Sequence, residues 1–234
     1  MATFVLVHGA WHGGWCWSRV VDRLTARGHK VYAPTLTGLA ERSHLLSRDI
    51  TLNTHIADVT NLMTWEDLSN VVLVGHSYGG WVISGVAEQA ASRLASIVFV
   101  DAFMPQDGER ALDMQAPPDR AATEAAWDRG ELSRPAPPIA HFGIANDADR
   151  DWALSRVTPQ PIGNAFTRIA LTGARDRVPT KAYIRARGAV RPMFDAYYDK
   201  LRGDPSWRLY DVPCGHDVMI DMPDRLTEIL LENA

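Results

Sequence analysis

Short, mostly apolar runs recur along the chain at intervals that suit alternating strands and helices. Runs that are apolar on both faces are typical of buried parallel strands. The expected strands are residues 4–7, 30–33, 71–74, 94–100, 181–186 and 207–212. Apolar positions with helical spacing predict helices over residues 17–26, 54–65, 80–89 and 193–201. This alternation predicts an α/β fold with a mostly parallel, doubly wound sheet, whose ligands bind beyond the carboxyl ends of the strands.

Between residues 105 and 180 the pattern breaks into prolines and short helical pieces. This segment is too interrupted to bury a core of its own, so we expect a lid inserted into one core domain formed by residues 1–104 and 181–234. Four aromatic residues of the segment are candidates for lining an apolar pocket under the lid, although packing is the commoner role for each. They are Trp127, Phe142, Trp152 and Phe166.

The third expected strand ends in Gly75-His76-Ser77-Tyr78-Gly79, which matches the G-x-S-x-G pattern of a nucleophile elbow. An elbow turns so sharply from strand to helix that side chains two residues before and after the serine would clash, and glycines occupy both places. The following helix would direct its N–H groups and dipole at developing negative charge. The pentapeptide also occurs in ordinary loops, but strand, turn and helix together favour Ser77 as a catalytic nucleophile.

Two other turns that follow expected strands carry groups that a serine nucleophile needs, namely oxyanion donors and a general base. A glycine-rich loop over residues 8–15 follows the first strand, and no Gly-Lys-Ser/Thr follows that would indicate a phosphate cradle. We expect the backbone N–H groups of Ala10 and Tyr78 to form an oxyanion hole; a plain tight turn is the alternative for the loop. His216 lies in a glycine-containing turn after the last strand, where the general base of a Ser…Asp…His order belongs.

Composition and charge limit the classes of partner. The 234 residues suit one domain, with 46% hydrophobic and 22% charged residues and a net charge of −4. This charge gives no basic face for nucleic acid or an anionic membrane. Without a signal-peptide pattern or a membrane-length apolar run, we expect a cytoplasmic protein. Cys16 and Cys214 are expected to be reduced thiols, since two cysteines provide neither a disulfide framework nor metal-ligand spacing.

With these residues identified, the chain resembles the α/β-hydrolase superfamily. Within it, the similarity is to the branch of plant hydroxynitrile lyases, salicylate-type methyl esterases and small bacterial esterases. The stretches that carry the resemblance are FVLVHGAWHGGWCW at 4–17, GHSYGG at 75–80, AFMP at 102–105 and the GHD turn at 215–217. Both halves of the expected core resemble this branch, whereas the expected lid shows hardly any similarity to it. The resemblance implies an α/β-hydrolase fold and a serine enzyme that needs no metal or organic cofactor.

Three positions separate the chain from the lyases of that branch. Those enzymes carry a threonine, a glutamate and a lysine where this chain has Gly9, His76 and Asp217. The lyase set handles cyanide, whereas the set in this chain looks like the esterase pattern. We therefore expect ester hydrolysis rather than C–C cleavage.

The acid of the triad is left open between two aspartates. By resemblance it should follow the strand at 181–186, yet no carboxylate stands there. Asp101 follows the strand after the elbow, a place that serves as the acid in some α/β-hydrolases; a strand-end cap is its alternative role. Asp176 lies in a segment similar to the usual D-x-V-P acid loop, but it precedes the expected strand. We favour Asp101. If the strand instead lies at 168–172, Asp176 follows it and becomes the favoured acid.

The resulting hypothesis is a serine esterase in which Ser77, His216 and Asp101 hydrolyse a small carboxylic ester, with aryl, methyl and carbamate esters all included. By resemblance Phe103 lies near the acyl group; lid packing is its alternative role. The expected partner is a small-molecule ester, with no nucleic acid and no membrane, and a homodimer is allowed. The alternatives are a hydroxynitrile lyase-like enzyme and a non-catalytic receptor for small ligands, because a fold does not fix a function.

Overall fold

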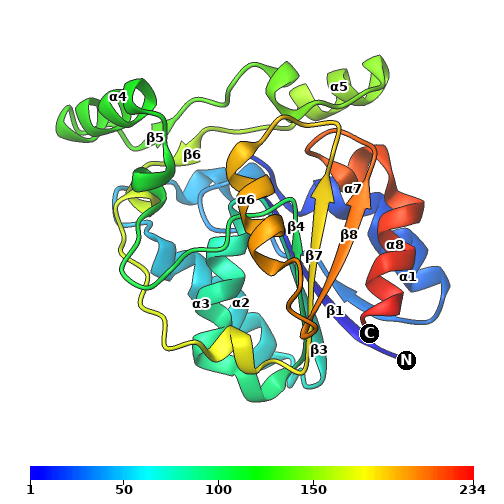
Figure 1. Cartoon of the computed structure of the whole chain (residues 1–234). Coiled ribbons are helices and arrows are strands. Elements are labelled where there is room, and N and C mark those ends of the chain that lie inside the picture. The colour runs from blue at the N-terminus through cyan, green and yellow to red at the C-terminus, as the bar shows by residue number, and fades with distance from the viewer.

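A computed structural model describes all residues from 1 to 234 and contains a six-stranded parallel sheet (Figure 1). The strand order is β2-β1-β3-β4-β7-β8, with the chain's first strand inside the sheet. The strands are β1 Thr3–Val7, β2 Lys30–Tyr32, β3 Val71–His76, β4 Leu94–Val100, β7 Thr180–Ala186 and β8 Trp207–Val212. All six predicted strands are present, within one or two residues of the expected bounds, and the α/β fold with a doubly wound sheet is confirmed.

Helices cover both faces of the sheet (Figure 1). One face carries α1 Ser18–Ala26, α7 Val218–Asp221 and α8 Pro223–Glu232, and the other carries α2 Leu52–Trp65, α3 Gly79–Ala90 and α6 Pro192–Leu201. Successive strand residues point to opposite faces. In β1, Phe4 and Leu6 join the cluster with α1 and α8, whereas Val5 and Val7 join the cluster with α2 and α3.

Short 3-10 helices complete the chain. They are η1 Gly14–Trp17, η2 Ala40–Leu45, η3 Ala91–Arg93, η4 Ala111–Met114, η5 Ile139–Phe142, η6 Gly163–Ala165 and η7 Ala174–Arg177. No helix is both long enough and apolar enough to cross a membrane.

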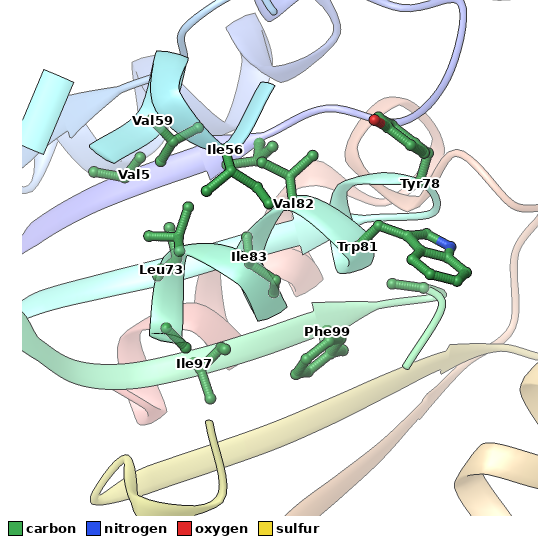
Figure 2. Packing of buried hydrophobic residues seen from close by; sticks show 14 of the residues in the cluster. Val5, Ile56, Val59, Leu73, Tyr78, Trp81, Val82, Ile83, Ile97 and Phe99 are labelled. Carbon is green, nitrogen blue, oxygen red and sulfur yellow. The ribbon is translucent and has the colours of Figure 1, made fainter. Parts of the chain in front are cut away.

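Helix α3, which directly follows the elbow, is packed between the sheet and α2 (Figure 2). Ile83 and Trp81 are completely buried, as is Val59 of α2. Gly85 allows the close approach of the two helices, since a Cβ there would lie 2.2 Å from Cδ1 of Ile56. Each such buried side chain stabilises the fold by roughly 1.5–3 kcal/mol. The packing therefore fixes the amino-terminal end of α3 behind Ser77.

The segment expected to form a lid contains α4 Pro117–Asp128, β5 Ser133–Arg134, α5 Asp147–Leu154 and β6 Gln160–Pro161. These elements lie beyond the carboxyl ends of the strands, at the top of Figure 1. The later part of the segment instead runs back along the sheet, with η6 against α2 and η7 against α3. The division into a core of residues 1–104 and 181–234 and a lid of residues 105–180 stays a prediction.

Candidate active site

Ser77 is at the turn between β3 and α3 and has a φ of 51°, in the left-handed region that non-glycine residues rarely adopt. Such a conformation costs about 1–3 kcal/mol and persists only where the surroundings hold it. From residue 71 to 87, Ser77 alone is not buried. Both glycines of the elbow are required by its close packing. A Cβ on Gly75 would lie 2.8 Å from the Gly79 carbonyl oxygen, and a Cβ on Gly79 would lie 2.7 Å from the Val7 oxygen.

Asp101 follows the last residue of β4 and is fully buried. Its Oδ2 accepts a hydrogen bond of 2.6 Å from Nδ1 of His216. Its Oδ1 accepts bonds from Nη1 of Arg185 at 2.9 Å and from the backbone N–H of Ala186 at 3.1 Å. Arg185 is itself 1% exposed and also pairs with Asp195. Both carboxylate oxygens are therefore occupied, and the side chain is held in one orientation.

The second candidate acid lies elsewhere. Asp176 is in η7, before β7 begins, so it lies at the amino-terminal edge of a sheet whose strands all run the same way. Its side chain is 61% exposed and faces Arg175 at 3.9 Å. The predicted strand at 181–186 is confirmed as β7, whereas Arg168 forms only an isolated bridge with Arg110. The structure brings Asp101, and not Asp176, to His216.

One cavity of about 210 Å³, the inner cavity, gathers most of the site residues expected from the sequence. Its lining includes Ala10, Ser77, Tyr78, Phe103 and His216. The backbone N–H groups of Ala10 and Tyr78 donate no hydrogen bond within the protein. Two unpaired N–H groups at the wall of a cavity that contains a serine hydroxyl are available to an oxyanion.

The proton arrangement of His216 follows from its partners. Nδ1 donates to Asp101, which leaves Nε2 as the nitrogen that can accept a proton. The backbone N–H of His216 donates to the carbonyl oxygen of Phe142 at 2.9 Å, so the end of η5 helps to hold the turn of His216 in place. Gly215 permits this contact, because a Cβ there would lie 2.0 Å from the Gly143 oxygen.

A second group of titratable side chains lies buried behind His216. His12 donates from Nδ1 to the Ala10 carbonyl at 2.8 Å and from Nε2 to Oδ2 of Asp217 at 3.0 Å. His76 donates from Nε2 to the backbone oxygen of His216 at 3.0 Å, and the two rings lie 4.5 Å apart. Burial and the neighbouring His216 hold the pKa of His76 well below its usual value, so this ring is neutral.

Three of these buried groups carry atoms of the kind that bind metal ions, but two of their nitrogens are already in use. His76, His216 and Asp217 place one potential ligand atom each within 4.8 Å of one another. However, Nε2 of His76 is occupied by the His216 oxygen, and Nδ1 of His216 is occupied by Asp101. A metal bound through these two nitrogens would have to break the hydrogen bonds that orient His216.

Sequence reasoning missed several polar residues at the wall of the inner cavity. Arg134, His141 and Arg191 line the inner cavity. The four aromatic candidates do not: Trp127 packs against Phe166 with ring centroids 4.9 Å apart, and neither Phe142 nor Trp152 lines the cavity. No periodicity or motif marked the three polar residues, because each reaches the site through contacts between distant parts of the chain. The sequence did contain a signal for Arg185, because it is the one charged residue among the otherwise mostly apolar positions 182–186 of the expected strand.

Comparison with known proteins identifies the family. The model of the family described as "Alpha/beta hydrolase family" matches residues 4–229. The chain belongs to this family. This α/β hydrolase is 41% identical, over 98% of each chain, to a carbendazim hydrolyzing esterase of Nocardioides sp. (strain SG-4G). It is 29% identical to methylesterase 7 of Arabidopsis thaliana, over 99% of this chain and 95% of the plant protein.

Solved structures agree on the fold. An extracellular α/β-hydrolase from a Paenibacillus species superimposes with a TM-score of 0.85 at 23% identity, over 100% of this hydrolase and 99% of that chain. A methylesterase from Arabidopsis gives a TM-score of 0.74 at 24% identity, over 99% and 98% of the two chains. The resemblance inferred from the motifs is confirmed. The expected enzyme class, a carboxylic ester hydrolase, is confirmed as well by the esterases among the relatives.

Proposed function

We propose that Ser77, His216 and Asp101 form a catalytic triad through which this enzyme hydrolyses small carboxylic esters. One observation carries the proposal. The hydrogen bond of 2.6 Å from His216 to the buried Asp101 leaves Nε2 of His216 free, and His216 lines the same cavity as Ser77. A strained serine, a histidine with one free nitrogen and a fixed carboxylate are the parts that acyl transfer needs.

The chemistry has two steps. His216 takes the proton of Ser77 as the serine oxygen attacks the ester carbonyl, and then gives that proton to the departing alcohol. The acyl group stays on Ser77 as an ester until water, deprotonated by His216, attacks it. His216 then gives this proton to the departing Ser77 oxygen, which releases the carboxylic acid and restores both side chains. Asp101 holds the imidazole in the productive tautomer and stabilises its charged form.

Ala10 and Tyr78 supply the oxyanion hole in this proposal. Their backbone N–H groups are unpaired and border the cavity, so they can donate to the negative oxygen of each tetrahedral intermediate. In other enzymes, loss of one such donor costs about a hundred- to a thousandfold in rate. Gly9 keeps this loop close to the nucleophile, since a Cβ there would lie 3.0 Å from Cβ of Ser77.

The volume of the inner cavity favours a small acyl or aryl ester, with Phe103 against the acyl group. A carbamate ester is open to the same attack at its carbonyl carbon. The relative named for carbendazim hydrolysis makes carbendazim a direct test substrate. Cytoplasmic location and a homodimer stay predictions from the sequence.

Turnover of p-nitrophenyl acetate and butyrate by the wild type and by Ser77→Ala tests the proposal. We expect the wild type to release p-nitrophenol and the variant to lose activity on the order of a millionfold, down to background. Equal background rates in both proteins would instead support a non-catalytic receptor. Release of cyanide from a cyanohydrin, with no ester turnover, would support the lyase alternative.

A further inference from the structure

The inner cavity contains two guanidinium groups and no carboxylate. Arg134 of β5 and Arg191, the residue before α6, both line it, whereas none of its lining residues is aspartate or glutamate. Neither arginine takes part in an ion pair within the structure; Arg191 donates only to the backbone oxygen of His141, at 2.6 Å. The side of the cavity that these two residues form is therefore positively charged.

Arg134 is held firmly although its charge is unpaired. Its guanidinium lies 5.5 Å from the centre of the Trp11 ring, and its Nε is buried without a hydrogen-bond acceptor. β5 pairs with β6, where Gln160 accepts a hydrogen bond of 2.8 Å from the backbone N–H of Trp11. Arg134 is thus tied to the residue that follows Ala10. The indole Nε1 of Trp11 is a second buried donor without an acceptor.

The two least exposed arginines of the chain, by contrast, have partners. Arg185 binds the carboxylates of Asp101 and Asp195, and Arg175 donates to the Pro105 oxygen at 2.7 Å. Burial lowers the pKa of Arg134, which means that its surroundings oppose the charge rather than stabilise it. A cation in such a place, with its own Nε and the neighbouring Trp11 Nε1 both without acceptors, lacks an anion that a ligand can supply.

The nearby acids do not fill this role. Asp119 and Glu131 line an adjoining outer groove of about 660 Å³ and are absent from the inner cavity. Glu131 pairs with Arg129 at 2.7 Å, and Asp119 forms no ion pair with Arg134. Arg134 lines both spaces, so it lies where the outer groove and the inner cavity meet.

We infer that the inner cavity selects esters that carry a carboxylate at the end remote from the scissile bond, and that Arg134 binds this carboxylate with Arg191 beside it. The inference rests on the proposed ester hydrolysis and adds a substrate class to it. A guanidinium presents paired N–H donors that match both oxygens of a carboxylate. A neutral ester of the same shape leaves the cation of Arg134 unpaired, so the site discriminates by charge.

The test compares two methyl esters of matched length, monomethyl adipate and methyl hexanoate, by titrating the acid released. We expect the wild type to have a kcat/KM for the anionic ester roughly 10- to 100-fold above that for the neutral one, the range for one charge-assisted hydrogen-bonded pair. Arg134→Gln should bring this ratio close to one. Arg129→Gln, in the outer groove and paired with Glu131, is the control and should keep the ratio.

A ratio near one in the wild type, or a ratio unchanged by Arg134→Gln, would overturn the inference while ester hydrolysis stands. Binding of monomethyl adipate to Ser77→Ala, measured by calorimetry with and without Arg134→Gln, gives a readout independent of turnover. We expect Arg134→Gln to weaken binding about tenfold or more; equal binding would also overturn the inference. If binding depends on Arg134 but neither ester is hydrolysed by the wild type, the proposed function fails and the anion site remains.

Discussion

Two aspartate–histidine pairs lie next to each other in this hydrolase and differ in what their histidines can do. Asp101 accepts from His216 at 2.6 Å, and Asp217 accepts from His12 at 3.0 Å. All four side chains are buried, and residues 216 and 217 are neighbours in the chain. Only His216 lines the inner cavity with Ser77. An aspartate–histidine pair therefore occurs once at the cavity that contains Ser77 and once in the protein interior behind that cavity.

The difference lies in the second nitrogen of each imidazole. His216 keeps Nε2 free, whereas His12 uses Nδ1 to donate to the Ala10 oxygen and Nε2 to donate to Asp217. Burial alone would lower the pKa of His12, but the adjacent Asp217 carboxylate outweighs burial and raises it. A histidine that donates from both nitrogens is a cation with no nitrogen left to accept a proton. The buried pair instead links the loop of Ala10 to the turn of His216.

The largest expected difference between the pairs is in catalysis. Asp101→Asn should lower kcat/KM on p-nitrophenyl butyrate by up to about four orders of magnitude, because an amide favours the wrong tautomer of His216. The exposed Asp176→Asn is the matched control and should retain wild-type turnover. A collapse of activity in the folded Asp176→Asn protein, with Asp101→Asn active, would reverse the assignment of the acid.

The pair of His12 and Asp217 should contribute mainly to the stability of the fold. Asp217→Asn removes one partner of a buried ion pair and leaves the cation of His12 uncompensated, which costs about 3–5 kcal/mol. Urea unfolding of the wild type and variant measures this loss. We expect the folded variant to keep more esterase activity than Asp101→Asn does. A variant as stable as the wild type but as inactive as Asp101→Asn would contradict the distinction between the pairs.

A smaller effect is the pH dependence of that stability difference. Burial opposes ionisation of Asp217, but the charge and hydrogen bond of His12 hold the Asp217 pKa below its ordinary 3.8, so its contribution is lost as the pH falls through that lowered value. The raised pKa of His12 gives a contribution that is complete below the ordinary 6.5 and is lost as the pH rises through the raised value. The gap between wild type and Asp217→Asn should be widest between pH 3.8 and 6.5. A gap that grows steadily above neutral pH would contradict this charge state.

The sheet and the elbow could be predicted because their signals are local. The run at 71–74 and the glycines around Ser77 act through neighbours in sequence. The preference for Asp101 over Asp176 followed from the order of the strands together with the resemblance to other α/β-hydrolases. Helices α7 and α8 were not predicted. The partners of Asp217 and the cavity residues Arg134 and Arg191 could not be found in this way, because their positions depend on contacts between residues 50 or more positions apart.

The most direct test of the central claim is the location of the acyl group during turnover. We expect acid quenching of the enzyme mixed with excess p-nitrophenyl acetate, followed by peptide mass spectrometry, to find an acetyl ester on the peptide that contains Ser77. Asp101→Asn, which slows deacylation, provides a second sample in which the adduct can persist. An acetyl group found only on another side chain, or rapid turnover by Ser77→Ala, would contradict the account.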